Sequence, residues 1–293
     1  MGRVAIQYSG KNIRILEISE KKSIKYIDQL DYLDSSVFFL EPKLNHKRIS
    51  ELSDLLISNM KKNSVYTDAI EFILDSRLAY ISVIPVDFSD EIDNTNSTLI
   101  WELSNFFPES YKNFKISYQK LKNSEDKPGT FGNTLLVAYH KQIAEITRRL
   151  SELTSIKFSK INFDVFTAGL YFQNTGISDF ICIGCKNDKT DISFYKCNKI
   201  RYFSGLYMKE KPSGYYYDEI NRILNLAEFS EISNIYVYGE ESAVSIYGNL
   251  NDNMQKRQVS MPDPFLNVNF DNPYDKIKNL PSFSFVPLFG IGL

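Results

Sequence analysis

Cys182 and Cys185 form a C-x-x-C motif, the spacing found in thiol redox centres and in one half of a structural zinc site. A zinc site needs a second pair of ligands, and the chain offers only one further cysteine and two histidines, His46 and His140. A redox pair needs a helix that begins beneath the first thiol, but this pair lies where a strand ends and a turn begins. We therefore interpret both thiols as small side chains of a core and a turn.

His140 is the other candidate for chemistry. It follows an apolar strand, Thr134 to Tyr139, and precedes an amphipathic helix, Lys141 to Leu153. No serine or cysteine motif accompanies it as a nucleophile. The position predicts a role at the start of a helix or in packing, rather than in catalysis.

The segment around the two cysteines predicts consecutive hairpins. Phe180 to Ile183 is a short apolar strand, Gly184 to Lys189 is a small polar turn, and Asp191 to Tyr195 alternates like a returning strand. A further turn leads to a third strand at Ile200 to Phe203. The N-terminus repeats this plan, with strands Val4 to Tyr8 and Ile13 to Ile18 around a turn. Two hairpins of one plan predict two related lobes that face a common cleft.

Strands and helices alternate in the rest of the chain. Apolar residues on one stripe predict a helix at His46 to Lys61. A further hairpin is predicted from two strands, Ala69 to Leu74 and Ala79 to Ile84. The alternation in Phe114 to Tyr118 predicts a strand with one apolar face. Phe163 to Phe172 predicts a helix whose small residues let another backbone approach. The pattern favours an α/β fold in which helices cover sheets.

Composition limits the class of protein. The 293 residues are 43% hydrophobic and 24% charged, as in globular proteins large enough for two domains. The net charge of −2 gives no basis for binding nucleic acid or anionic lipid through the whole surface. The N-terminus lacks an apolar signal core, and no apolar stretch is long enough to span a bilayer. We expect a cytosolic chain without a membrane span.

Several motifs occur in the order of one known family. Tyr80 to Pro85 with an acidic loop, the helix around Trp101-Glu102 that ends at Pro108, the strand Leu135 to Tyr139, and the Gly239 turn all follow that order. The chain resembles the PilM-type pilus assembly proteins, actin-like relatives of the cell-division protein FtsA. The resemblance covers nearly the whole chain and rests on order and spacing.

The resemblance implies an actin-like (ribonuclease H-like) two-lobe α/β fold with an inserted small α+β subdomain. The first lobe would comprise residues 1–65 together with 151–175 and the tail 281–293. The inserted subdomain would comprise residues 66–150, and the second lobe residues 176–280.

The family's nucleotide site is only partly kept. The acidic position of the first hairpin is occupied by Gln7, with Tyr8 in the place of a glycine, and Cys182 replaces the acid of the second. We therefore expect that no carboxylate remains on either hairpin to orient a hydrated magnesium ion, and that Glu240 repels nucleotide. Were ATP and magnesium bound, the resemblance implies this site: Ser9, Gly10, Lys11, Gly184, Cys185, Lys186, Glu219, Arg222, Gly239 and Glu240.

The functional expectation is a cytosolic, PilM-like adaptor without ATPase activity, peripheral to the inner membrane through a partner. It would bind the short cytosolic tail of a PilN-like membrane protein in a groove between the first lobe and the inserted subdomain. The floor of that groove is predicted at Ile84, Phe114, Ile116 and Tyr118. The alternatives are an active ATP-binding protein or ATPase, and the cytosolic domain of a type II secretion protein of the GspL kind. Self-association also stays open.

Overall fold

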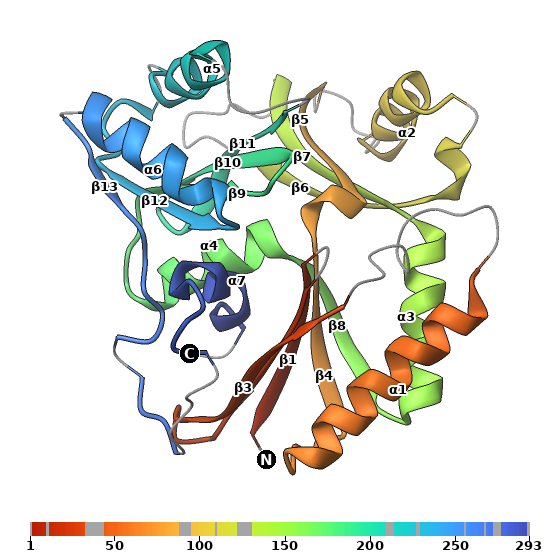
Figure 1. Cartoon of the computed structure of the whole chain (residues 1–293). Helices are drawn as coiled ribbons and strands as arrows, with labels where there is room; N and C mark the ends of the chain where they lie inside the picture. Colours follow the sequence, from red (N-terminus) through yellow and green to blue (C-terminus); the bar gives the residue numbers. More distant parts are fainter. Residues whose placement is uncertain are drawn as a thin grey trace.

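The computed structural model describes residues 2–9, 12–32, 44–87, 95–108, 110–121, 131–208, 214–226, 229–254, 256–266, 268–271 and 277–291. These residues form two five-stranded sheets and one three-stranded sheet, with helices packed on them (Figure 1). The predicted site residues Gly10 and Lys11 lie outside the described residues.

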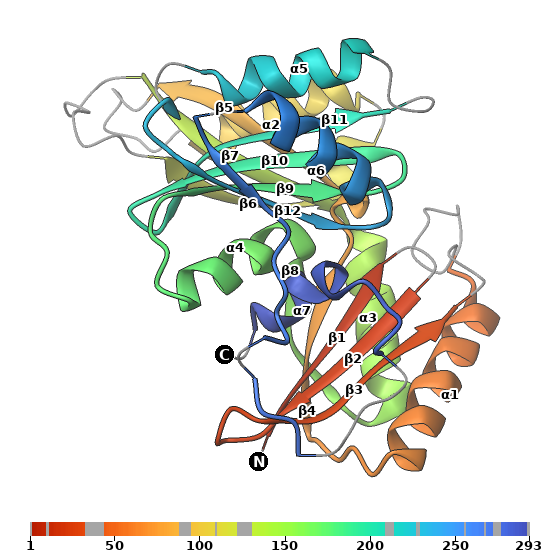
Figure 2. The ribbon, with the colours of Figure 1, turned by 60° about the vertical axis from the view of Figure 1, so that its left-hand side comes forward.

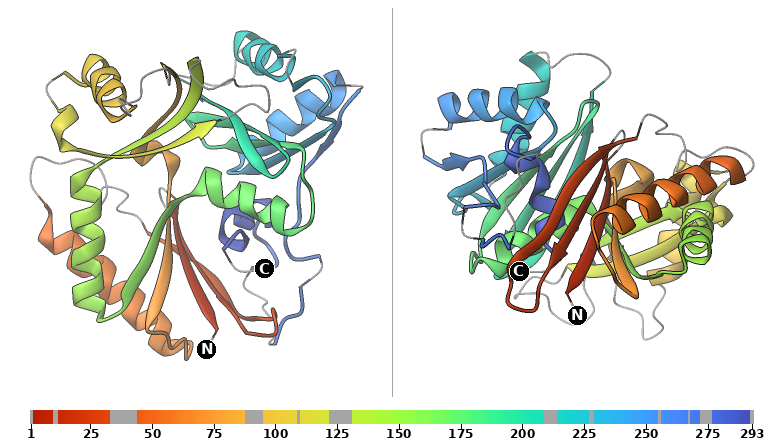
Figure 3. Two further views of the ribbon diagram at one scale, coloured as in Figure 1. Left: turned by 180° about the vertical axis from the view of Figure 1, so that it is seen from behind. Right: turned by 60° about the horizontal axis from the view of Figure 1, so that its bottom comes forward.

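The first lobe contains a sheet of order β3-β2-β1-β4-β8. Its strands are β1 (Arg3–Ser9), β2 (Asn12–Ile18), β3 (Ile24–Asp31), β4 (Ala69–Leu74) and β8 (Lys157–Phe163). The first three strands are antiparallel, and β4 and β8 continue the sheet in parallel with β1. The helices α1 (His46–Lys62) and α3 (Lys141–Thr154) pack together along one side of this sheet (Figure 3). His140 caps α3 as expected, because its Nδ1 accepts the Gln142 N–H at 3.2 Å.

The second lobe repeats this topology with the order β11-β10-β9-β12-β13. Its strands are β9 (Phe180–Cys185), β10 (Lys189–Lys196), β11 (Lys199–Tyr207), β12 (Asn234–Gly239) and β13 (Gln258–Ser260). Again three strands are antiparallel and two continue in parallel. The helices α5 (Gly214–Leu224) and α6 (Ser242–Asn253) cover one face (Figure 2). The expectation of two lobes opened by similar hairpins is confirmed.

The third sheet has the order β5-β7-β6 and is fully antiparallel. It consists of β5 (Ala79–Asp87), β6 (Phe114–Leu121) and β7 (Phe131–His140). The helix α2 (Thr95–Phe106) packs on one face through Leu99 and Leu103, which are fully buried. Short 3-10 turns at Ser76–Leu78 and Tyr111–Asn113 lead into β5 and β6.

The predicted hairpin between residues 69–74 and 79–84 is wrong. β4 pairs in parallel with β1 and β8, whereas β5 turns away and pairs with β7. The buried residues of β4 suit a central parallel strand, so the turn after it begins a crossing to another sheet. Consequently β4 and α3 belong to the first lobe. The insertion expected at 66–150 narrows to the stretch from β5 to β7.

The lobes meet at a seam formed by two helices, α4 (Asp164–Asn174) and α7 (Val286–Phe289), the latter preceded by a 3-10 turn at Ser282–Phe285 (Figure 2). A Cβ on Gly290 would lie 1.7 Å from the Thr167 carbonyl oxygen, so only glycine permits this approach. A Cβ on Gly169 would lie 2.1 Å from the Tyr195 hydroxyl. Gly169 in α4 thus makes room for the ring of Tyr195 rather than for another backbone.

Candidate functional site

The turn of the second hairpin carries the lysine at the centre of the candidate site. β9 ends at Cys185 and β10 begins at Lys189, and the Lys186 N–H donates to the Lys189 carbonyl at 2.8 Å. Lys186 lies in the seam between the lobes, where 5% of the residue is exposed. A charged side chain this deeply buried requires partners of opposite charge.

Three carboxylates and a hydroxyl surround the Lys186 ammonium. Its Nζ lies 2.6 Å from Oδ2 of Asp191 and 3.2 Å from Oδ2 of Asp164, and it donates to the Ser76 hydroxyl at 2.6 Å. Asp75 lies farther away, with Oδ1 3.9 Å from the same nitrogen. With a second lysine these residues form what we call the interlobe cluster: Asp75, Ser76, Asp164, Lys186, Lys189 and Asp191.

Parallel strand pairing explains how the first lobe supplies its acids. Leu74, the last residue of β4, is the register partner of Phe163, the last residue of β8. The residues that follow them, Asp75 and Asp164, therefore emerge side by side at one edge of the sheet. The backbone N–H of Ser76 fixes the pair further, because it donates to Oδ1 of Asp164 at 3.1 Å.

The second lysine completes the pairing of Asp191. Nζ of Lys189 lies 2.9 Å from Oδ1 of Asp191 and donates to the Ser76 carbonyl at 3.3 Å. It also lies over the ring of Tyr207, 5.3 Å from the centroid, a cation–π geometry. The Ser76 hydroxyl is also within hydrogen-bonding distance of the Asp191 carboxylate. Each oxygen of Asp191 thus faces an ammonium group.

A second layer of charges around Arg77 joins the two lobes. The Arg77 guanidinium lies 2.6 Å from Asp75, 2.9 Å from Asp188 and 3.4 Å from Glu240, and so connects the two lobes. The other oxygen of Glu240 accepts the Asn187 N–H at 2.9 Å. Glu240 is therefore paired within the chain, a role that the sequence analysis did not foresee.

Burial and mutual attraction set the protonation of this cluster. Burial by itself lowers the pKa of Lys186, but Asp164, Asp191 and Asp75 together raise it above its usual value. Burial raises the pKa of Asp191, yet Lys186 and Lys189 bring it below the usual value. Asp164 is the exception: burial, with Asp75 and Asp191 close by, raises its pKa to about 6 despite Lys186. Burial is the largest cause of this rise in the pKa of Asp164.

The cavity left between the hairpins is very small. Its volume is about 20 Å³, and its walls include Gln7, Ser9, Gly184 and Glu240. Ligand pockets usually measure about 300–1,000 Å³, whereas a space of this size holds about one water molecule. Tyr238 contributes to the closure, since a Cβ on Gly184 would lie 2.6 Å from its hydroxyl. The tyrosine ring thus covers β9 at the glycine where a phosphate was expected.

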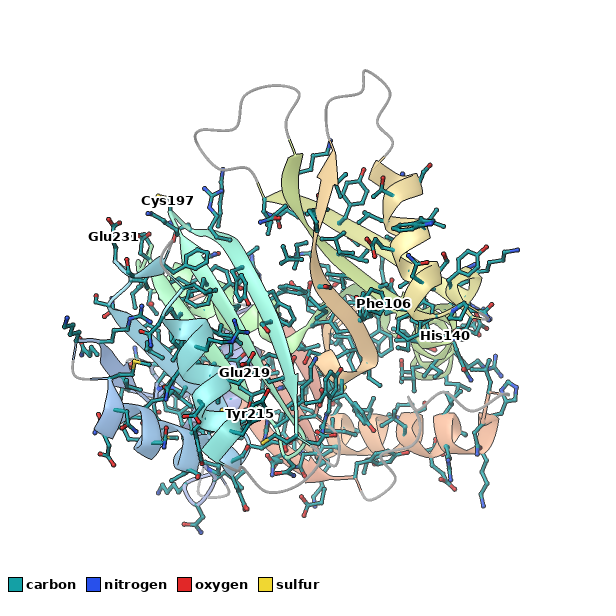
Figure 4. The ribbon with its side chains drawn as sticks, turned by 90° about the horizontal axis from the view of Figure 1, so that it is seen from above. Phe106, His140, Cys197, Tyr215, Glu219 and Glu231 are labelled. Carbon is teal, nitrogen blue, oxygen red and sulfur yellow. The ribbon has the colours of Figure 1, made fainter. Side chains whose placement is uncertain are left out.

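The structure brings some of the predicted nucleotide-site residues together and places others elsewhere. Residues brought together around the small cavity are Ser9, Gly184, Cys185, Lys186, Gly239 and Glu240. Glu219 and Arg222 do not line it: they pair with each other at 2.6 Å on α5, which lies on the outer face of the second sheet (Figure 4). Glycine is required at position 239 by the backbone itself, because the φ of this residue is +121° and a Cβ would lie 2.1 Å from the Cys185 carbonyl oxygen.

The second hairpin carries two carboxylates, Asp188 and Asp191, and both are held in ion pairs, with Arg77 and Lys186 respectively. The first-lobe members of the interlobe cluster were missed. Asp191 alternates with Ile192 and Phe194 like a polar residue on the exposed face of a strand, so nothing in the local pattern marked it as buried. Tyr8 does not enter the cleft, because it is buried in the core while its neighbours Gln7 and Ser9 line the cavity.

A larger cavity of about 430 Å³ lies between the third sheet and the seam. One wall is the face of β6 and β7 opposite to α2, where Ser117 pairs with Val137 and Gln119 with Leu135. The other wall combines α4 with the hairpin of β10 and β11, through these residues: Phe166, Leu170, Gln173, Tyr195, Asn198, Lys199 and Ile200. We call this space the sheet–seam cavity.

The predicted groove residues lie mainly on the other face of the sheet. Ile84, Phe114 and Ile116 pack with the cluster beneath α2, and only Tyr118 also lines the sheet–seam cavity. Side chains alternate between the faces of a strand. The apolar face of β6 is therefore used by the subdomain's own core, which leaves the more polar face toward the cavity.

The C-x-x-C thiols are core side chains as expected. Cys182 and Cys185 are fully buried, and burial raises the pKa of both thiols. Cys197 is exposed at the tip of the β10–β11 hairpin (Figure 4). In the described part of the chain, no group of three or more acidic, histidine or cysteine side chains could hold a metal ion. Nor is any helix there long and apolar enough to cross a membrane.

Two lobes of one strand order, joined by helices at a seam and carrying an inserted subdomain, define an actin-like fold. No family model matches the sequence, and no curated protein matches it. Among solved structures, the chain is similar to one described as the PilM-PilN type IV pilus biogenesis complex. The TM-score is 0.74 at 12% identity, with 98% of this chain and 96% of that chain covered.

Two further structures support the same fold. A Bacteroides thetaiotaomicron protein with an actin-like ATPase fold and unknown function matches with a TM-score of 0.54 at 12% identity, covering 90% of this chain and 91% of that one. The cytoplasmic domain of EpsL, an inner-membrane component of the Vibrio cholerae type II secretion system, matches at 0.51 and 5% identity, with 99% and 94% covered. The resemblance to PilM-type proteins is thereby confirmed at the level of the fold.

Proposed function

We propose that this chain is a cytosolic adaptor that binds a short tail peptide of an inner-membrane protein, and that its cleft has no nucleotide-dependent role. The fold shared with the PilM-PilN complex supports this class of function. The observation that carries the proposal is the sheet–seam cavity, about 430 Å³ in volume, within the size range of ligand pockets.

The chemistry of the cavity suits an extended, largely apolar segment. Leu135, Val137, Phe166 and Leu170 provide apolar contact. Three consecutive residues of β6, from Ser117 to Gln119, line the space, so the strand presents its edge as well as one face. Within the described residues β6 pairs only with β7. An added peptide strand could use the free backbone groups, while side-chain pockets provide specificity.

The small cavity between the hairpins supports the second half of the proposal. The lysine available for phosphate is already paired with three carboxylates, and the turn glycine lies under Tyr238. Phosphoryl transfer depends on positioned charges around an accessible phosphate. In this protein the charged side chains of the interlobe cluster pair with one another instead. We therefore propose a scaffold role rather than ATP hydrolysis.

The test is a titration with the cytosolic tail of the membrane protein encoded beside this gene. A fluorescent peptide is titrated with the wild type, with Leu170→Asp in the cavity, and with the control Ile100→Asp on α2. The two positions are 42% and 44% exposed, so they are matched in the cost of a surface charge.

Leu170→Asp should weaken binding by about tenfold or more, which corresponds to about 1.4 kcal/mol, because the charge faces the apolar segment. Ile100→Asp should leave the affinity unchanged. Absence of binding by the wild type, or equal losses in both variants, would contradict the assignment. The identity of the neighbouring membrane protein also separates a pilus system from a secretion system.

A further inference from the structure

Two elements of the structure extend from the interlobe cluster to the sheet–seam cavity. Asp164 is the first residue of α4, and farther along the same helix Leu170 and Gln173 line the cavity. The strand β10 of the second lobe also runs from the cluster to the cavity. Asp191 lies near its start, and Tyr195 near its end lines the cavity. The helix and the strand therefore each join one site to the other.

The helix and the strand touch at two places. At the first, Lys186 and the carboxylates of Asp164 and Asp191 tie the start of α4 to the start of β10. At the second, the ring of Tyr195 lies against Gly169, where a Cβ would be 2.1 Å from its hydroxyl. Tyr195 is itself stacked on Phe180 with ring centroids 4.6 Å apart. Near the same end, the Gln173 amide donates to the Asn198 carbonyl at the hairpin tip at 3.0 Å. The cluster is thus the contact that holds the far end of the helix against the strand, and these contacts beside the cavity hold the near end.

The first contact is costly to break because its charges are buried. The members of the cluster are at most 5% exposed, so solvent screens their attraction poorly. Removing one partner of a buried ion pair leaves an uncompensated charge and is strongly destabilising. Opening the cluster therefore requires hydration of several charges together. The second sheet, of which β10 is an inner strand, could then turn relative to α4 about the contacts at Tyr195 and Asn198.

We propose that the interlobe cluster controls the shape of the sheet–seam cavity by fixing the angle between α4 and β10. The Lys186 ammonium supplies, from within the chain, the cation that holds the lobes together. The cavity is thus kept in its binding shape without an added ligand. That the shape governs peptide affinity rests on the proposed function, whereas the control of the geometry does not.

The geometry can be measured with a natural label site. Cys197 lies at the hairpin tip beside the cavity and is the only exposed cysteine, since the other two are fully buried. A second nitroxide is placed at Lys115→Cys, an exposed position on β6 across the cavity. The distance between the labels is measured by double electron–electron resonance in otherwise wild-type protein and in Lys186→Met.

Two further variants make the comparison decisive. Ser76→Ala removes the hydroxyl that connects Lys186 with Asp191 but changes no charge, so it reports on the cluster even where Lys186→Met folds poorly. Lys160→Met is the control, because its ammonium lies 3.7 Å from Glu71 in an exposed pair and is 67% exposed. Peptide affinity is measured on the unlabelled proteins.

Lys186→Met should broaden or shift the distance distribution, and Ser76→Ala should do so less, while Lys160→Met leaves it unchanged. Peptide affinity should fall by about fivefold or more in Lys186→Met, as for typical coupled sites. An unchanged distribution in both cluster variants overturns the inference, whereas unchanged affinity despite a changed distance overturns the link between the shape of the cavity and peptide binding. A wild type that binds no peptide refutes the proposed function, while the distances still decide whether the cluster sets the geometry.

Discussion

The ring of Tyr238 lies across Gly184, its register partner on the neighbouring strand, so that a Cβ on the glycine would come within 2.6 Å of the tyrosine hydroxyl. Both residues line the small cavity between the hairpins. The glycine thus accommodates a side chain of the same protein at the place where the sequence analysis expected a phosphate.

Magnesium-ATP should therefore bind no tighter than roughly millimolar, which is about 4 kcal/mol. The remaining cavity of about 20 Å³ cannot admit a triphosphate without moving the lobes. Isothermal titration calorimetry on the purified protein measures this, and a micromolar dissociation constant would contradict it. The double variant Gln7→Asp, Cys182→Asp should bind no better, because Cys182 lies in the apolar core rather than at the cavity.

The raised pKa of Asp164 predicts a pH-dependent stability. An acid whose pKa is raised in the folded state stabilises the fold fully below its unfolded pKa, near 3.8, and this contribution is lost as the pH rises through about 6. Asp164→Asn keeps the shape without the charge. The stability of the wild type relative to the variant should fall by up to about 3 kcal/mol as the pH rises from about 4 to about 7.

Urea unfolding at both pH values gives this difference directly. The control is Glu231→Gln, which removes a carboxylate from an exposed ion pair with Lys196 and should show no such trend. An equal difference between wild type and Asp164→Asn at both pH values would mean that Asp164 does not change its protonation in this range.

Two glycines, one at the seam and one on an open side of a helix, should respond in opposite ways to substitution by alanine. Gly290→Ala would force a methyl group against the Thr167 carbonyl and should destabilise the protein by about 1–3 kcal/mol or more. Gly248 lies within α6 with no atom within 4 Å of its added Cβ. Gly248→Ala should stabilise by about 0.5–1 kcal/mol, since alanine favours the helix. Denaturant unfolding of both variants tests the pair, and a tolerated Gly290→Ala would argue against this seam.

The native protein should expose one reactive thiol. Cys197 is exposed, whereas Cys182 and Cys185 are fully buried with raised thiol pKa values, which suppresses the nucleophilic thiolate. Titration with a disulfide reagent should give one rapid equivalent per chain in buffer and three in denaturant. Rapid reaction of a second thiol in the native protein would show that the core around β9 opens easily.

Local patterns were sufficient for most of the elements and for the relation between the lobes. The alternation in residues 4–18 and 180–203 predicted both opening hairpins, and the apolar stripe of α1 and the position of His140 were correctly interpreted. The error at Ala69–Leu74 arose because a strand followed by a short turn resembles a hairpin, while its parallel pairing with β1 depends on residues far away in sequence.

The candidate site was harder to predict for the same reason. Asp75, Asp164 and Lys186 come from three separated segments, and no spacing within one segment marks them as a group. Lys186 was identified but assigned to phosphate, because two of its three carboxylate partners, Asp75 and Asp164, become its neighbours only when the lobes come together. For β6, the alternation was recognised, but which face meets α2 could not be known from the strand alone.

The contact between Arg14 and Ser284 has a consequence for synthesis on the ribosome. The guanidinium of Arg14 is buried, lies 5.0 Å from the Phe285 ring centroid and donates to the Ser284 carbonyl at 2.8 Å. Burial lowers its pKa to about 10, a sign of how little water reaches it. During translation, the strand that carries Arg14 emerges long before Ser284 exists. The first lobe therefore cannot complete its core until the chain has been made as far as α7, and until then a charged core position and the surface for α7 stay uncovered.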